Sequence, residues 1–111
     1  MSKKYTVFLI AYRNVDERVE KILTNSSVKT IDTLDDLDQN EVFNSRGFSL
    51  NNRVDIYVDW FKKKAREKID KGYEVAILEV PKSVGETKAE LLNELDIGFE
   101  EDILVLETID I

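Results

Sequence analysis

Two long apolar runs dominate the pattern of hydrophobic and polar positions in this chain. Residues 5–12, YTVFLIAY, and residues 73–80, YEVAILEV, are rich in β-branched and aromatic side chains and hold few polar positions. Such runs are typical of strands that are buried on both faces of a sheet. We therefore expect the two most uniformly apolar stretches, 7–11 and 75–80, to form the central strands.

The clearest helical pattern lies at 53–71. Apolar side chains there recur at the i, i+3, i+4 and i+7 spacing of one helix face, at Val54, Tyr57, Val58, Phe61 and Ala65. Gly72 follows at the position where a glycine commonly ends a helix. This segment is therefore predicted to be an amphipathic helix that ends just before the second apolar run.

Two further helices are predicted from their capping patterns. Asn14 with Glu17 three residues later, and Ser83 with Glu86, both have the form of a capping box. The first helix is expected to run to about residue 25, and the second to turn three leucines inward. Weaker patterns predict four short elements: strands at 28–31, 48–50 and 103–109, and a helix within 33–43.

Together these elements predict one globular domain over residues 1–111. The alternation of strands and helices favours an α+β (or α/β) fold. We expect a single-layer mixed sheet of three to five strands, with two or three helices packed on one or both of its faces.

Composition excludes several classes of chemistry. The chain has neither cysteine nor histidine, so a thiol nucleophile, an imidazole base and the usual zinc sites cannot exist in it. We expect no metal, no cofactor and no catalytic residues, which favours a protein that is not an enzyme. The apolar stretch 7–11 is too short for a signal peptide or a membrane span, and Arg13 follows it closely. These features predict a cytoplasmic protein.

The charge is unevenly distributed along the chain, which carries a formal net charge of −7. Residues 62–71 hold six basic side chains against two acidic ones, in the second half of the predicted long helix. There they complement the negative end of the helix dipole, and direct binding of nucleic acid is not expected. Acidic side chains gather at 32–41, where the spacing does not fit a calcium loop, and at 86–111, where nine acids face one lysine.

The acidic clusters carry the main functional hypothesis. They form either solvated surface or a binding face for a cationic partner, because a row of carboxylates can steer and hold a basic protein. The candidate contact residues are Asp35, Asp36, Asp38, Trp60, Glu100, Glu101 and Asp102. Small acidic proteins of this composition include phage anti-defence and toxin-immunity inhibitors. The expected partner is a protein with a basic surface, nucleic-acid-binding proteins included.

Two alternatives stay open. Arg13 after the first strand, Ser49 before the long helix and Asp102 at the last strand resemble, in outline, the ADP-ribosyltransferase family. That resemblance implies that Arg13 holds a nicotinamide dinucleotide (NAD), that Ser49 orders the pocket and that Asp102 stands at the position of the catalytic glutamate. The other alternative is a structural subunit of a larger assembly, in which a second chain buries Trp60.

Overall fold

The computed structural model describes residues 5–31, 54–98 and 100–110, without the side chains of residues 29 and 54–60. Its described strands form one sheet in the order β2-β3-β1-β4, and every neighbouring pair is antiparallel. The α+β class and the single sheet with helices packed on it are therefore confirmed, and the described pairing is antiparallel where a mixed sheet was expected. The strands are β1 (Tyr5–Tyr12), β2 (Ser27–Ile31), β3 (Glu74–Pro81) and β4 (Ile103–Asp110).

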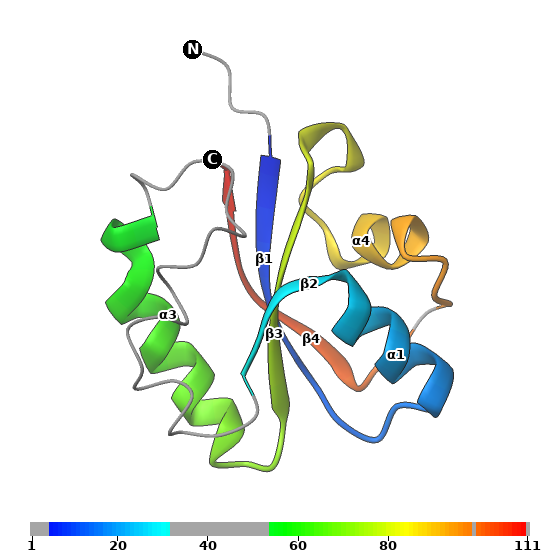
Figure 1. Cartoon of the computed structure of the whole chain (residues 1–111), viewed down its shortest axis with the longest axis horizontal. Helices are drawn as coiled ribbons and strands as arrows, with labels where there is room; N and C mark the ends of the chain where they lie inside the picture. Colours follow the sequence, from blue (N-terminus) through cyan, green and yellow to red (C-terminus); the bar gives the residue numbers. More distant parts are fainter. Residues whose placement is uncertain (1–4, 32–53, 99, 111) are drawn as a thin grey trace.

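Helices cover both faces of this sheet (Figure 1). Helices α1 and α4 lie on one face, and α3 lies on the other. None of the described helices is both long and apolar enough to cross a membrane. The helical elements are α1 (Glu17–Ser26), α3 (Val54–Ile69), the short 3-10 helix η3 (Lys82–Val84) and α4 (Lys88–Glu94).

The connectivity interleaves two β-α-β units. In the unit β1-α1-β2 the two strands are parallel and β3 lies between them, and in β3-α4-β4 the strand between is β1. This is the ferredoxin-like arrangement of a split β-α-β fold. Helix α3 is inserted between the two units and covers the face that α1 and α4 leave open.

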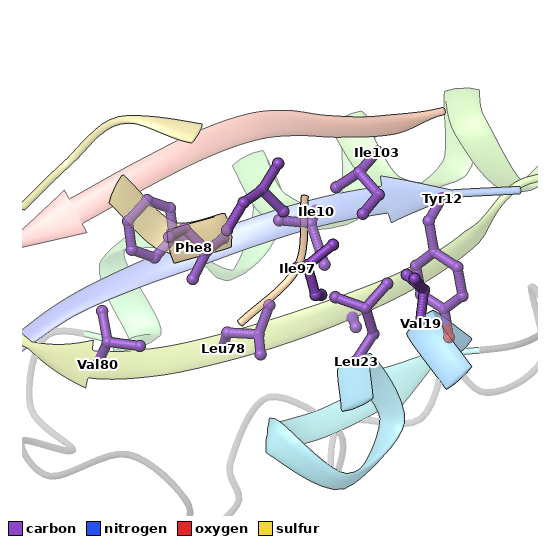
Figure 2. Close-up of a cluster of buried hydrophobic side chains, with 12 residues drawn as sticks. Phe8, Ile10, Tyr12, Val19, Leu23, Leu78, Val80, Ile97 and Ile103 are labelled. Atoms are coloured by element: carbon purple, nitrogen blue, oxygen red, sulfur yellow. The ribbon is translucent and has the colours of Figure 1, made fainter. Parts of the chain in front are cut away.

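Two hydrophobic clusters fill the space on the two sides of the sheet. Alternate residues of the central strands point into opposite clusters, as the pleat of a strand requires. Leu9 and Ile77 face α3, which contributes Phe61 and Ala65. On the opposite face Phe8, Leu78 and Val80 pack with residues of α1 and α4 (Figure 2). The predicted central position of both apolar runs is thereby confirmed.

Strand β1 is buried along almost its whole length, including Thr6. Its pairing with β4 shifts register between Leu9 and Ile10, where β4 carries the extra residue Leu106. Such a bulge bends and twists the strand that contains it. Residues 104–110 of β4 are only half-buried, so this strand is the less protected neighbour of β1.

The helix starts differ from the predicted capping boxes. Helix α1 is capped by Asp16, whose carboxylate accepts a hydrogen bond of 2.8 Å from the backbone N–H of Val19. Asn14 instead adopts a left-handed conformation with φ of 56° in the turn after β1. Helix α4 is capped by Thr87 with Glu90, because the residues from Lys82 onward form a 3-10 turn first.

Helices α3 and α4 each end in a left-handed residue. Gly72, with φ of 88°, follows α3, and the N–H of Tyr73 bonds back to the carbonyl of Lys68. Asp96, with φ of 58°, ends α4 in the same way, with a bond from Ile97 to Leu92. Both are Schellman motifs, in which a left-handed residue lets the backbone satisfy the last carbonyls of the helix.

Candidate functional site

Five carboxylates crowd the connection between α4 and β4, and we call this set the acidic segment: Glu94, Asp96, Glu100, Glu101 and Asp102. The segment is fastened to the rest of the fold by its backbone. The N–H of Arg13 donates to the carbonyl of Asp102 at 3.3 Å, and the guanidinium of Arg18 donates to the carbonyl of Asp96 at 3.4 Å. These two bonds tie the backbone at Asp96 and at Asp102 to α1 and to the end of β1.

The carboxylates of the acidic segment lack counter-charges among the described ion pairs, as do a few other acids such as Glu20, Glu67 and Glu74. Elsewhere, lysines pair with Glu17, Glu86, Glu107 and Asp110 at 2.8 to 3.8 Å. Within the described part of the chain, none of the five carboxylates of the acidic segment takes part in an ion pair. Three of them, Glu94, Asp96 and Glu101, are exposed. Their repulsion is therefore not relieved by the fold.

Arg13, next to this segment, is oriented by an aromatic ring. Its guanidinium lies 4.1 Å from the ring centroid of Tyr73 and donates from Nη1 to the carbonyl of Lys71 at 3.0 Å. The ammonium of Lys68 lies 5.5 Å from the same ring centroid. Cation–π contacts of this kind hold a cation in place without neutralising it. Arg13 has no carboxylate partner among the described ion pairs.

A hollow of about 250 Å³ opens beside Arg13, where β1 ends and β3 begins. It is smaller than the roughly 300–1,000 Å³ that is usual for a ligand pocket. Its walls come from β1, the turn to α1, α1 itself and the start of β3. The lining residues are Tyr12, Arg13, Asn14, Val15, Glu20, Gly72 and Glu74.

Tyr12 is the buried wall of this hollow, with only 2 % of its surface exposed. Burial raises the pKa of its phenol to about 12, although a hydrogen bond with Thr24 opposes the shift. The nearby carboxylates of Glu74 and Glu20 add to the rise in pKa. In Figure 2 the hydroxyl of Tyr12 points out of the hydrophobic cluster toward α1. The phenol is therefore a neutral hydrogen-bonding group at ordinary pH.

The structure describes only part of the predicted site. Arg13 and Asp102 are brought together through their backbones, and Glu100 and Glu101 lie beside them. Trp60 lies in α3, but its side chain is outside the described residues. Four predicted site residues also lie outside the described residues: Asp35, Asp36, Asp38 and Ser49.

Of the residues that line the hollow, only Arg13 was predicted as a site residue, and the titratable ones that sequence reasoning missed are Tyr12, Glu20 and Glu74. Tyr12 reads as the last apolar position of a buried strand, and Glu20 as a solvated helix residue. The one available signal was the hydroxyl of Tyr12, because a buried tyrosine needs a polar partner. The sequence gives no sign that this partner would come from the start of β3, which is a neighbour only in the folded sheet.

Among the described residues, no group of three or more acidic side chains is placed to hold a metal ion. Comparison of the chain with protein-family models, with curated proteins and with solved structures finds no match. Function must therefore be inferred from the charges and the hollow themselves.

Proposed function

We propose that this protein is a small acidic binding protein that engages a basic surface of a partner protein and thereby inhibits it. Phage anti-defence and toxin-immunity proteins are the kinds of protein that work in this way. The observation that carries the proposal is the acidic segment, whose five carboxylates have no counter-charge within the described residues.

Physical reasoning supports an outward-facing role for this segment. Adjacent like charges at Glu100, Glu101 and Asp102 do not help the chain to fold, and ion pairs with lysines show that this fold can neutralise acids elsewhere. Hydrogen bonds from the backbone N–H of Arg13 and from the guanidinium of Arg18 tie down the backbone at Asp102 and Asp96, which lowers the entropy lost on binding. A partner with lysine and arginine side chains would supply the missing positive charge and would be steered toward it.

The test compares two charge variants with the same change in net charge. Immobilised wild-type protein, E100Q/E101Q and the control E67Q/E86Q are used to capture proteins from the cells that express the gene. Glu67 and Glu86 are exposed and lie outside the acidic segment. A partner should be retained by the wild type and by the control, and lost with E100Q/E101Q.

The association rate of the purified partner should then fall about tenfold or more between low and high salt, because screening acts mainly on steering. The proposal is wrong if E100Q/E101Q still captures every protein that the wild type captures. It is also wrong if the control E67Q/E86Q loses the same proteins as E100Q/E101Q.

A second candidate is an NAD-binding protein similar to ADP-ribosyltransferases, which the contact between Arg13 and Asp102 favours. NAD at millimolar concentration would then raise the melting temperature, since a ligand of the native state stabilises it. Arg13→Ala would remove that rise. The two carboxylates in the adjacent hollow would repel a diphosphate, so the acidic binding protein is the better supported candidate.

A further inference from the structure

The hollow beside Tyr12 is lined by charges of both signs that do not meet. Arg13 forms one part of its wall, and Glu20 and Glu74 form others. None of the described ion pairs joins Arg13 to either glutamate. Oppositely charged side chains around one small space would gain electrostatic energy from direct contact. Because they stay apart, a ligand that carries both charges could bridge them.

The chemistry of the wall defines the charge pattern of such a group. A carboxylate can receive paired hydrogen bonds from the guanidinium of Arg13, whose described bond to the carbonyl of Lys71 uses only one of its five N–H donors. An ammonium group can donate to the carboxylates of Glu20 and Glu74. A purely anionic ligand would be repelled by the glutamates, and a purely cationic one by the arginine.

The wall is also held in shape before any ligand arrives. Arg13 is stacked on Tyr73, and Glu74 lies opposite Tyr12 in the sheet, within reach of its hydroxyl. Asn14 and Gly72 line the hollow with left-handed backbones, at φ of 56° and 88°. Strained non-glycine residues such as Asn14 are concentrated at ligand sites, where the surrounding fold enforces them.

We propose that this hollow binds a small α-amino acid as its zwitterion, with the carboxylate on Arg13 and the ammonium group between Glu20 and Glu74. The volume of about 250 Å³ limits the ligand to one of the smaller amino acids. The polar lining favours a short side chain. This site is separate from the proposed acidic interface, because Glu100 and Glu101 do not line the hollow.

The test uses three probes that differ by one charged group. L-Alanine, propionate and ethylammonium are titrated separately into the full-length protein, and backbone amide signals are followed by NMR. Alanine should shift the signals of Asn14, Gly72 and Glu74 in a saturable way, and the two single-charge analogues should not. Glycine and L-serine extend the series to the neighbouring side-chain sizes.

Variants then test separately the side of the hollow that would bind the carboxylate and the side that would bind the ammonium group. R13Q and E20Q should each weaken alanine binding about tenfold or more, which corresponds to the loss of a charged hydrogen bond. K21Q is the matched control, because Lys21 lies on α1 but does not line the hollow. An equal response to propionate or to ethylammonium, an undiminished affinity of R13Q and E20Q, or no saturable shift with any of the three amino acids would overturn the proposal. None of these results affects the capture experiment with E100Q/E101Q.

Discussion

Replacing Tyr12 with phenylalanine should change how the stability of this protein depends on pH. The phenol has an ordinary pKa of 10.0 when the chain is unfolded, and burial raises it to about 12 in the fold. Between these two values the unfolded chain loses the proton and the folded chain keeps it. Stability is therefore unaffected by this group below pH 10 and falls as the pH rises from 10 toward 12.

The size of the effect follows from the shift in pKa. A difference of about two units corresponds to about 2.7 kcal/mol in total, and about half of it, or about 1.4 kcal/mol, is lost by pH 11. Tyr12→Phe removes this loss, because phenylalanine does not ionise. At pH 8 the variant should itself be less stable by about 1 kcal/mol, since the hydrogen bonds to Thr24 and Glu74 are gone.

Urea unfolding of the wild type and of Tyr12→Phe measures both effects: the lost hydrogen bonds at pH 8, and the ionisation of Tyr12 from the change between pH 8 and pH 11. All other groups titrate in both proteins. The free energy of unfolding lost between pH 8 and pH 11 therefore differs between the two proteins only by the contribution of Tyr12. The wild type should lose about 1.4 kcal/mol more than the variant. Equal losses would show that the phenol of Tyr12 is not shielded in the folded state, and the account of the hollow's buried wall would then be wrong.

Substitutions at two other positions, Phe61 and Asp16, probe the elements that frame the site. Phe61→Ala should cost about 3–5 kcal/mol in urea unfolding, because the ring is 2 % exposed between α3 and the sheet; a cost below about 1 kcal/mol would mean that α3 does not pack there. Asp16→Ala should cost about 1 kcal/mol through loss of the α1 cap, and Asp16→Asn much less. Equal melting temperatures for these two Asp16 variants would contradict the assigned cap.

Much of the fold could be predicted because its strongest signals are local. The apolar runs at β1 and β3 predicted central strands, and the sheet places both of them there. Phe61 and Ala65 were correctly assigned to the inner face of the long helix. A strand that is buried on both faces needs apolar side chains at nearly every position, so it can be recognised from the sequence alone.

The helix ends and the hollow could not be predicted in the same way. Asn14 and Asp16 are both good capping residues, and the turn that leaves β1 decides which of them caps α1. The hollow depends on the placement of Glu74 opposite Tyr12, which is a matter of strand register between distant parts of the chain. The choice of antiparallel pairing likewise follows from the interleaved connections, which no local pattern encodes.

The interleaved sheet also constrains how the protein is made. Strand β1 is synthesised early, yet its two neighbours, β3 and β4, come from the second half of the chain. The nascent chain therefore carries its most apolar stretch without its first partner until β3, residues 74–81, has been synthesised. Pairing between distant segments is slow to form and leaves such stretches open to aggregation. A product that ends before β4 would leave one edge of β1 uncovered, so it should be recovered mainly as insoluble material.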